Sequence, residues 1–522
     1  MNQEEIKKKQ KRVMVYVMII SLICVVGVSY AFFTAGMSSE TSTTVRADAG
    51  TMKITYDGGK KINLVGIYPK DDVWATKTIT VTGNNTTDAE MYYKLTLVVD
   101  SNTFKIDDPL QYELVSTNTS TNGEIIPNIS KTDITGTSIE LGSGHFVKAN
   151  NAKHTYLLKI YYPKKATSQN ANQGAAFSAH VEITSAKAPT VINLVKAIRA
   201  NNEVKAPITT PGAAVSTASE ALLASTEDDY GTSYYFRGAV TNNYVEFANK
   251  CWRIVRVGGD GSVKLILHND NTTGVANPCD AANNSASAAF ARYSGTTYKS
   301  AFNTNYNDNA YVGFKFGTVG SSTYEATHAN TNNSTILTNL EAWYNNNDNF
   351  KKYEKVIADT VWCNDKTNVT DTTYNPWNMS NVNGLGYGTN TTYYGATQRL
   401  VSKSNSAGGT GPSLKCNGEL SKIASKVGLI TADELAYAGY AWNIGNTTTY
   451  LQENATDTYW WSLSPGIFVG SSAGVWRVGG SNGGLNRSDV DYTGGLRSSI
   501  SLKSTTSVTG EGTSSSPYII SM

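Results

Sequence analysis

The feature that most constrains the fold of this chain is an alternation of apolar and polar residues between positions 37 and 188. Successive side chains of a β-strand point to opposite faces, so this period of two predicts strands that bury one face each. Turn-forming sequences such as Asp57-Gly58-Gly59 and Gly83-Asn84-Asn85 separate the segments, with no helical period between them. We therefore predict an antiparallel all-β sandwich, jelly-roll or immunoglobulin-like, over 37–188. The clearest segments are Tyr93, Leu95, Leu97 and Val99; Tyr156, Leu158, Ile160 and Tyr162; and Phe177, Val181 and Ile183.

A second constraint is the N-terminus, where a basic stretch from Lys7 to Arg12 precedes an uncharged run from Val13 to Phe33. A helix of that length spans roughly 30 Å, the thickness of the bilayer hydrocarbon. The basic flank should remain inside the cell. Residues 1–36 are thus predicted to be a transmembrane signal-anchor helix that inserts into the membrane, with the rest of the chain outside. The alternative is a secreted protein, because Ser29-Tyr30-Ala31 places small residues where a signal peptide is cleaved after Ala31.

Length and charge limit the classes of function. With 522 residues, the chain exceeds the size at which one hydrophobic core keeps growing, so more than one domain is expected. Lys and Arg total 44 against 42 Asp and Glu, which gives a net charge of +2. Such a balance provides no basic surface for a nucleic-acid partner.

Four cysteines lie outside the N-terminal segment: Cys251, Cys279, Cys363 and Cys416. An even number in an exported region allows two disulfides with three pairings, and the shorter loops favour 251–279 and 363–416. Buried free thiols are the alternative. No C-x-x-C motif occurs, so neither a zinc ribbon nor a thioredoxin-like site is expected.

The segment 189–228 is predicted to connect two domains. Val191, Leu194, Val195 and Ile198 have helical spacing and indicate a short amphipathic helix. The stretch from Pro207 to Asp229 is rich in Ala, Ser, Thr and acidic residues, which is typical of an exposed linker.

Residues 229–522 combine strand and helix signals. Gly259-Asp260-Gly261 separates two β-rich runs and predicts a hairpin. Helices are expected around 340–344 and 353–361, and Thr431 with Glu434 forms a capping box that begins another. Asp433 and Glu434 are adjacent and diverge on a helix, so we interpret them as capping residues rather than as a catalytic pair. An α+β domain is therefore predicted.

The beginning of the chain resembles camelysin and TasA-type biofilm fibre proteins of Firmicutes. The resemblance rests on Tyr30-Ala31-Phe32-Phe33 and on Ala49-Gly50-Thr51-Met52-Lys53-Ile54. It implies export, surface display and a jelly-roll-like sandwich, and it opens the alternative that the protein is a fibre or biofilm-matrix subunit. Camelysins are described as metalloproteases, but no H-E-x-x-H motif joins the histidines here, so no metal site is expected. The three histidines of this region are His145, His154 and His180.

The C-terminal region resembles C-type-lectin-like domains related to the formylglycine-generating-enzyme fold, which recur in Firmicutes surface proteins. The residues that carry the resemblance are Tyr459 to Pro465, Val475 to Val478 and Gly494 to Arg497. Leu496 and Ser498 depart from the usual G-V-R-P ending. The resemblance implies a recognition domain over 229–522, and binding more than catalysis. The reactive cysteine pair of the formylglycine-generating enzymes has no counterpart, because the last cysteine is Cys416.

Two local motifs suggest chemistry, but neither is complete. Gly470 to Gly474 matches G-x-S-x-G, yet no histidine follows Ser472. Asp489-Val490-Asp491 resembles part of a calcium loop without its further acidic ligands. No catalytic residue and no cofactor is predicted, and calcium is the one ion that the pattern allows; an extracellular enzyme is the less favoured class.

A glycine-rich stretch over 474–497 carries the candidate ligand-binding residues. Aromatic and Arg side chains concentrate binding energy, whereas Asn adapts to different partners. We predict a cell-surface recognition or adhesion protein in which the sandwich is a stalk and this stretch binds a glycan or protein of a host or neighbouring cell. Trp460 and Trp461 are instead expected in the core. The candidate ligand-binding residues are Trp476, Arg477, Asn482, Asn486, Arg487, Asp489, Asp491 and Tyr492.

Overall fold

The computed structural model describes residues 43–48, 51–85, 90–118, 122–185, 191–270, 275, 277–382, 384–385 and 390–521. The predicted membrane helix over 1–36 lies outside these residues. Among the helices of the described ranges, none has the length and apolar character needed to cross a membrane. The chain divides into two compact units, Met1–Pro189 and Thr190–Met522, each of which is described by itself.

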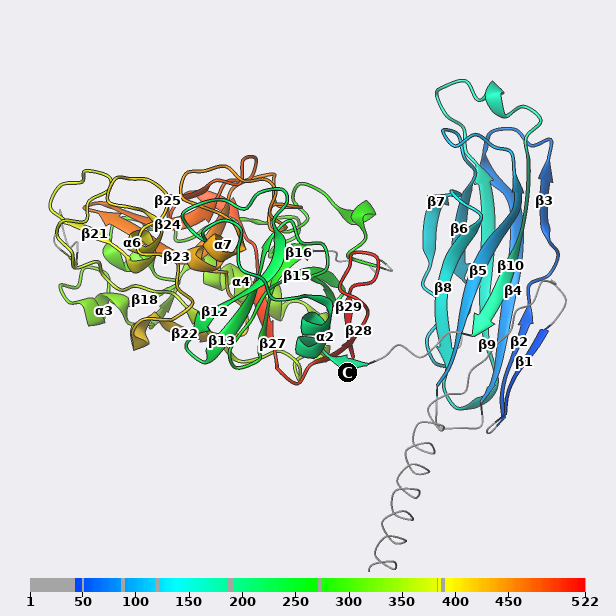
Figure 1. Cartoon of the computed structure of the whole chain (residues 1–522), viewed down its shortest axis with the longest axis horizontal. Coiled ribbons are helices and arrows are strands. Elements are labelled where there is room, and N and C mark those ends of the chain that lie inside the picture. Colours follow the sequence, from blue (N-terminus) through cyan, green and yellow to red (C-terminus); the bar gives the residue numbers. More distant parts are fainter. Residues whose placement is uncertain are drawn as a thin grey trace, which may run out of the picture. The chain divides into compact units, whose positions relative to one another are not determined.

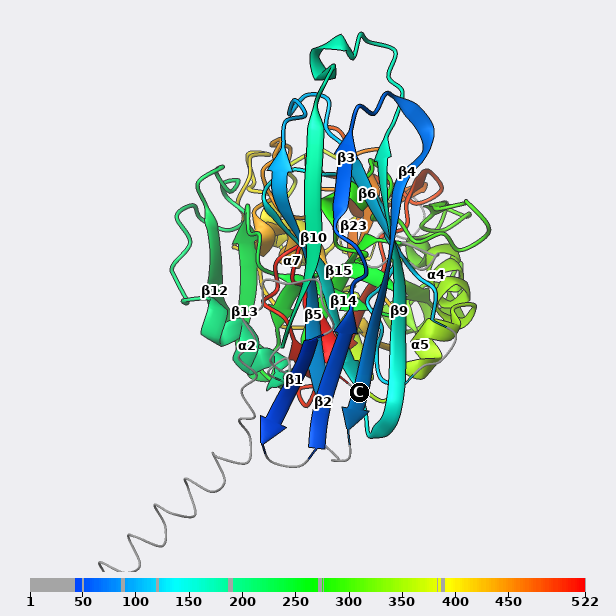
Figure 2. The same ribbon diagram turned by 90° about the vertical axis from the view of Figure 1, so that its right-hand side faces the viewer.

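The first unit consists of two antiparallel sheets (Figure 1). The six-stranded sheet has the order β1-β2-β4-β9-β6-β7, and the four-stranded sheet has the order β3-β10-β5-β8. Figure 2 shows their strands running lengthwise through the unit. The first sheet contains β1 (Thr43–Asp48), β2 (Thr51–Asp57), β4 (Lys70–Asn85), β9 (Ala149–Tyr162), β6 (Gln111–Ser116) and β7 (Ile129–Asp133). The second contains β3 (Ile62–Val65), β10 (Ala176–Ser185), β5 (Met91–Asn102) and β8 (Ser138–Phe146).

The core of this unit lies between its two sheets and contains the residues that alternate in the sequence. Along β5 every second residue from Met91 to Val99 is buried, and the intervening residues are partly exposed. One buried cluster includes residues from both sheets, for example Leu97 from β5 and Leu158 from β9. The prediction of an all-β sandwich is confirmed at this level.

One predicted turn in the first unit is wrong. Gly83-Asn84-Asn85 lies inside β4 and continues its pairing with β9. The glycine is needed for packing, because a Cβ on Gly83 would lie 2.4 Å from a ring carbon of Phe146. A composition typical of turns therefore reflects a close side-chain contact here.

The second unit combines two larger sheets with short helices. A nine-stranded sheet has the main order β11-β28-β29-β14-β15-β13-β12, and β16 joins β15 to β27. Its strands are β11 (Ile192–Asn193), β28 (Ser507–Thr509), β29 (Tyr518–Ser521), β14 (Tyr244–Phe247), β15 (Lys250–Val257), β13 (Gly231–Gly238), β12 (Ala221–Asp228), β16 (Val263–Asn269) and β27 (Ser499–Leu502). The hairpin predicted at Gly259-Asp260-Gly261 joins β15 to β16 and is confirmed.

A six-stranded sheet contains the glycine-rich region. Its order is β17-β26-β23-β24-β25, and β21 also pairs with β23. Its strands are β17 (Lys299–Ala301), β26 (Thr493–Gly495), β23 (Trp460–Val469), β24 (Ser472–Val478), β25 (Leu485–Asp489) and β21 (Thr391–Tyr393). Two short pairs complete the strands: β18 (Lys315–Phe316) with β19 (Asn332–Asn333), and β20 (Thr360–Cys363) with β22 (Lys422–Ser425).

The helices of the second unit are short. They are α2 (Leu194–Asn201), α3 (Tyr324–His328), α4 (Thr335–Asn345), α5 (Asp348–Lys352), α6 (Gly395–Leu400) and α7 (Ala432–Ala438), together with single 3-10 turns. The capping box on α7 is confirmed. The Thr431 side chain accepts a hydrogen bond from the Glu434 backbone N–H, and the Glu434 carboxylate accepts one from the Thr431 backbone N–H. The helix expected at 353–361 is wrong. α5 ends at Lys352 and β20 begins at Thr360, because a β-branched and aromatic segment pairs with β22.

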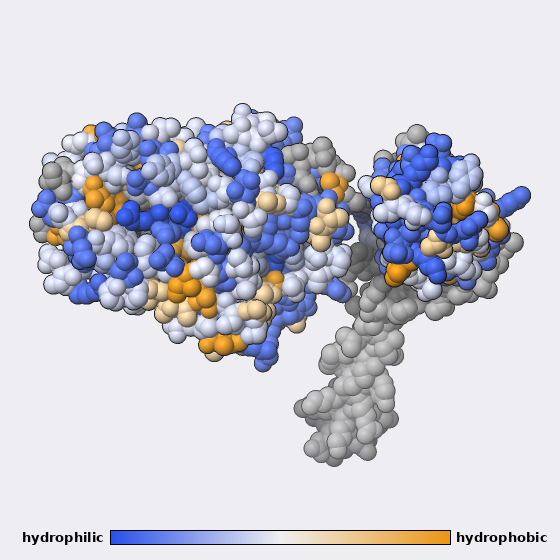
Figure 3. All heavy atoms as spheres, turned by 90° about the horizontal axis from the view of Figure 1, so that it is seen from above, coloured by the Kyte–Doolittle hydropathy of each residue, from blue (hydrophilic) through white to orange (hydrophobic). Residues whose placement is uncertain are grey.

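The predicted linker from Pro207 to Asp229 is also corrected, because it belongs to the second unit. Its last residues form β12, which pairs with β13 along its whole length. Glu220 is fully buried and accepts a bond from Arg237 at 3.0 Å. Acidic residues made this segment look like an exposed linker. Its carboxylate is nevertheless buried, because it pairs with an arginine that is distant in the sequence. On the face of this unit that Figure 3 shows, apolar residues form only small separate groups among polar ones.

Both disulfides join the predicted partners. Cys251 is bonded to Cys279, and Cys363 is bonded to Cys416. The first bond lies in a buried cluster with Tyr244, and the second ties β20 to the segment before β22.

Candidate functional site

The glycine-rich stretch does not form one loop. Most of it is an antiparallel strand pair, in which Trp476 of β24 is opposite Arg487 of β25 and Arg477 is opposite Asn486. Opposite residues share a face and successive residues alternate, so Arg477 and Arg487 lie on opposite faces of the sheet. β25 is the last strand of its sheet. The candidate residues are therefore distributed over two hollows.

The first hollow, which we name the tryptophan hollow, has a volume of about 430 Å³. Four of the predicted residues line it, namely Asn486, Arg487, Asp489 and Tyr492. Ser488 also contributes, and the other lining residues come from distant segments that sequence reasoning missed: Trp377, Asn405, Trp442 and Asn443. No local motif marks them, because each lies on an irregular loop and reaches the hollow only through the tertiary fold.

Asn405 holds the two tryptophans of this hollow in place. Its Oδ1 accepts from the indole Nε1 of Trp377 and of Trp442, each at 3.0 Å. The two rings lie 5.4 Å apart, and Trp442 packs edge-on against buried Trp476 at the same distance. Asn405 adopts a left-handed backbone conformation with φ of 61°, which asparagine tolerates better than most residues. The aromatic wall is therefore fixed before any ligand binds.

Arg487 lies over the ring of Trp377, with the guanidinium carbon 4.6 Å from the ring centre. Within the described part of the chain, its guanidinium makes no hydrogen bond or ion pair. Burial lowers the pKa of Arg487, and Asp489 opposes this shift from beyond ion-pair distance. A half-buried cation with unused N–H donors thus borders the hollow.

The second hollow, which we name the tyrosine hollow, has a volume of about 330 Å³. It contains Arg477, whose guanidinium carbon lies 4.9 Å from the ring centre of Tyr459. Arg477 Nε donates to Ser488 Oγ at 2.9 Å, and burial lowers the pKa of Arg477. Burial also raises the pKa of Tyr459 to about 12. The lining residues are Thr456, Asp457, Thr458, Tyr459, Arg477, Gly479, Gly480, Ser481 and Asn482.

Two of the predicted residues line neither hollow. Trp476, expected to be an exposed contact residue, is fully buried in the core of the unit. The correction follows from the strand register, which points Trp476 toward Trp442 beneath the tryptophan hollow. Asp491 lies in the turn after β25 and lines neither hollow. Trp460 and Trp461 are fully buried, as expected.

A third site, which we name the charged cavity, has a volume of about 130 Å³ and was not predicted. Arg256 contacts Asp228 and Glu434 at 2.9 Å each, and Lys264 contacts Glu434 at 2.6 Å. Burial alone would raise the pKa of Glu434, but Lys264 and Arg256 lower it to about 2. The carboxylate is therefore ionised at neutral pH.

The other wall of the charged cavity is built from a second set of ion pairs. Arg399 contacts Asp365 and Asp433 at 2.7 Å each. The neighbours Asp433 and Glu434 thus form ion pairs with different basic side chains, as their divergence on a helix predicts. Both cysteines of the Cys363–Cys416 disulfide also line this cavity. Because the buried charges named above satisfy one another, we interpret them as a network that stabilises the fold.

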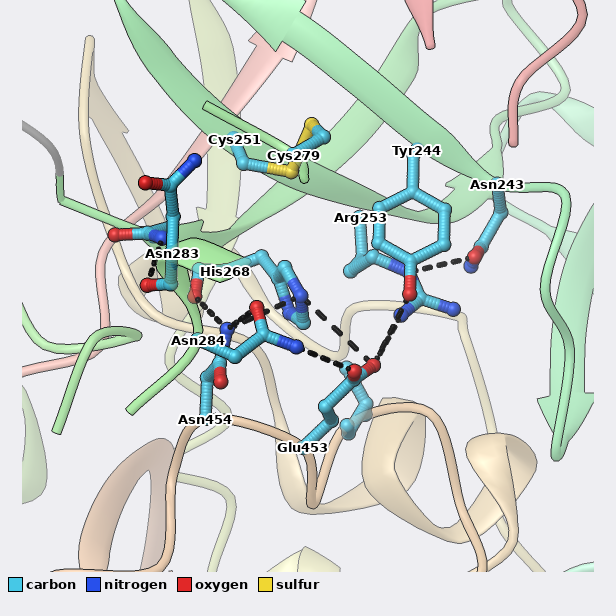
Figure 4. A network of polar contacts seen from close by, with 12 residues as sticks. Asn243, Tyr244, Cys251, Arg253, His268, Cys279, Asn283, Asn284, Glu453 and Asn454 are labelled. Atoms are coloured by element: carbon cyan, nitrogen blue, oxygen red, sulfur yellow. Dashed lines mark hydrogen bonds and ion pairs between the residues drawn. A yellow bond between two sulfur atoms is a disulfide. The ribbon is translucent and has the colours of Figure 1, made fainter. Parts of the chain in front are cut away.

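A further polar network lies beside the Cys251–Cys279 disulfide (Figure 4). Glu453 contacts Arg253 and the hydroxyl of Tyr244 at 3.0 and 3.1 Å. His268 lies 3.2 Å from Asn454 Nδ2, and burial lowers the pKa of His268 well below its usual value. His268 is therefore neutral near pH 7. We interpret this network as structural, because its side chains mainly satisfy one another.

The two chemical motifs have structural roles in this region. Gly470 to Gly474 spans the tight turn between β23 and β24, so the strand-turn-helix geometry of a nucleophile elbow is absent there. Within the described ranges no group of three or more His, Cys, Asp or Glu side chains could hold a metal ion. The histidines of the sandwich have different partners. His154 contacts Tyr93 and Asn122, His180 pairs with Asp100 and Glu182, and His145 lies near Glu90 and Glu124.

In comparisons with known proteins, no protein-family model matches this chain, and no curated protein matches it.

Proposed function

We propose that this protein recognises a ligand outside the cell and that its second unit binds a glycan in the tryptophan hollow. The observation that carries the proposal is the fixed pair Trp377 and Trp442 beside Arg487, whose guanidinium has no hydrogen bond or ion pair among the described residues. Sugar rings offer C–H faces that pack on aromatic rings and hydroxyls that bond to charged or amide groups. The hollow is lined by both aromatic rings and charged or amide side chains.

Further support comes from the residues around Arg487. Asn443 and Asn486 supply amides, Asp489 supplies an acceptor, and Tyr492 is 57% exposed at the rim. Exposed tyrosine next to adaptable amides is typical of surfaces that bind polar ligands with few hydrophobic contacts. A C-type-lectin-like fold for this unit and a role in adhesion are part of the same proposal.

The proposed location is the outer face of the cell membrane, through the N-terminal apolar run, or the medium if the chain is cleaved after Ala31. Two disulfides suit an oxidising compartment outside the cytoplasm. Protease added to intact, wall-stripped cells should degrade the chain beyond about residue 36. Protection of the whole chain would contradict export.

The binding proposal is tested with the full-length chain on a glycan array. Arg487→Gln and Trp377→Ala should each reduce the signal about tenfold or more, because truncated aromatic and arginine contacts carry most of the energy of such sites. Lys205→Ala is the control, since Lys205 is exposed and lines neither hollow. Equal binding by all four proteins would reject the tryptophan hollow as the site.

A fibre or matrix subunit is the second candidate. In the described part of the sandwich, β7 and β8 are each the last strand of a sheet, and such edges can pair with another chain. The edge of β8 is bridged at His145 by Glu124. Negative-stain microscopy and a sizing column separate the candidates. Filaments would support the subunit, and a monomer that binds glycans would support the recognition protein.

A further inference from the structure

The two hollows repeat one arrangement on opposite faces of β25. Each contains an arginine stacked on an aromatic ring, Arg487 on Trp377 and Arg477 on Tyr459, at 4.6 and 4.9 Å. Neither arginine has a carboxylate at ion-pair distance among the described residues. The acid of the tyrosine hollow, Asp457, is instead held by Lys299 at 3.0 Å and by the hydroxyl of Tyr298 at 2.9 Å.

Several other arginines in the same unit are held by acidic or backbone partners instead, although Arg199 and Arg292 also stack on tyrosine rings. Arg237, Arg253, Arg256 and Arg399 all pair with Asp or Glu at 2.7 to 3.0 Å. Arg497 is buried and donates to backbone carbonyls. Arg477 and Arg487 differ from these, because each borders an open hollow and, among the described residues, neither pairs with a carboxylate. Arg477 uses only its Nε, which donates to Ser488. A planar guanidinium of this kind matches a carboxylate or sulfate best.

One hydrogen bond links residues of the two hollows. Ser488 lines the tryptophan hollow and accepts the hydrogen bond from Arg477 of the tyrosine hollow. Of the described strands, β24 alone pairs with β25. The other edge of β25 is bridged at Leu485, where the backbone N–H of Asn443 donates to the Leu485 carbonyl and Trp442 forms a single parallel bridge. The Arg487 backbone N–H at this strand is satisfied by the Asn486 side chain at 2.8 Å. A ligand chain could therefore cross the strand without breaking backbone pairing.

We propose that the ligand is an acidic oligosaccharide that crosses β25 and places one carboxylate or sulfate against Arg487 and another against Arg477. This inference rests on the proposed function and specifies its ligand. A sugar chain is favoured over an acidic peptide because each acidic group would lie next to an aromatic ring, Trp377 or Tyr459, on which a sugar ring can pack. The amides of Asn443 and Asn482 provide partners for sugar hydroxyls in the two hollows.

The test is isothermal titration of the full-length chain with hyaluronan oligosaccharides of increasing length and with neutral chito-oligosaccharides of equal length. Hyaluronan oligomers should bind about tenfold tighter or more, and raising the salt concentration should weaken them selectively. Short hyaluronan fragments should occupy two sites on each chain, whereas long ones should bind as one ligand with higher affinity.

Variants assign the two sites. Arg477→Gln should remove one of the two short-fragment sites and weaken the long oligomer about tenfold; Arg487→Gln should do the same at the other hollow. Lys205→Ala removes a charge elsewhere and should bind as the parent does. A thermal melt of each variant excludes unfolding, and Gln keeps much of the side-chain volume, so a folded protein is expected.

Equal affinity for the neutral oligomers would overturn the acidic ligand and leave glycan recognition intact. Poly-glutamate that competes as well as hyaluronan would overturn the choice of a sugar chain. A single short-fragment site that only Arg487→Gln removes would overturn the crossing of β25. If no glycan binds at all, the proposed function itself fails.

Discussion

The charged cavity and the tryptophan hollow lie in the same unit and both contain arginine, but the surroundings of that arginine are opposite. In the charged cavity, Arg399 is held between Asp365 and Asp433. In the tryptophan hollow, Arg487 is held by the face of Trp377 and has no acidic partner at ion-pair distance among the described residues. A hollow alone therefore does not distinguish a binding site from a structural site. The distinguishing feature is whether its arginine is paired with a carboxylate.

The comparison predicts which residues cost stability and which cost binding. An ion removed from a buried pair leaves its partner uncompensated, which destabilises the fold strongly. A stacked arginine without an acidic partner leaves no such charge behind when it is replaced. Charged-cavity variants should thus unfold more easily, and tryptophan-hollow variants should fold but bind poorly.

The largest effect is expected for Glu434→Gln, which leaves Lys264 without its acidic partner. The free energy of unfolding should fall by about 3–5 kcal/mol. The folded pKa of Glu434, about 2, lies below its ordinary value of 4.5. Its contribution is therefore complete above about pH 4.5 and is lost as the pH falls toward 2. Urea unfolding at pH 7 and pH 3 measures both effects.

The matched control for this variant is Glu419→Gln, which affects the exposed pair with Lys422. It should change stability little, because solvent screens surface pairs. If Glu434→Gln were as stable as the parent, with an unchanged dependence on acid pH, the charged cavity would not be the stabilising network described above.

Trp476→Ala tests whether a residue directly beneath the tryptophan hollow contributes to stability rather than to binding. A fully buried tryptophan replaced by alanine should cost about 3–5 kcal/mol. Trp461→Ala, equally buried, should cost a similar amount. Thermal and urea melts test both. A Trp476→Ala protein that melts like the parent and has lost only binding would restore Trp476 as a contact residue.

Removal of the Cys363–Cys416 bond should have the next largest effect. The double replacement by alanine should destabilise the fold by about 3–4 kcal/mol in the chain-entropy model. Non-reducing peptide mapping by mass spectrometry should find 363 linked to 416 and 251 linked to 279. Alkylation of all four cysteines in unreduced, denatured protein would contradict both bonds.

Much of the fold could be predicted from the sequence where local pattern decides it. The alternation along β5 and the capping box of Thr431 and Glu434 are each set by residues a few positions apart, and both were correctly predicted. The misassigned linker shows the limit. Glu220 looks like a solvated residue in sequence, and only Arg237, folded back against it, makes it a core residue.

The candidate site could be predicted only in part, for the same reason. Residues on β25 were found because they form one glycine-rich stretch with aromatic and charged side chains. Trp377 and Trp442 could not be found, because the contact that joins them is a shared bond to Asn405 from a third segment. Arg477 and Arg487 lie on opposite faces of the sheet because of the strand register. The sequence did not reveal this, because its glycine content indicated a loop rather than two paired strands.

A small change in stability is expected for Arg487→Gln, and this variant tests the proposed binding site most directly. Glycan-array binding should be measured beside a thermal melt for this variant, with Tyr68→Ala on the sandwich, where Tyr68 is 64% exposed, as the comparison. We predict that Arg487→Gln melts within about 1 kcal/mol of the parent and binds about tenfold more weakly, as expected for a surface contact residue. Tyr68→Ala should bind as the parent does. If Arg487→Gln binds like the parent and Tyr68→Ala does not, the ligand binds to the sandwich, which contradicts a binding site in the tryptophan hollow.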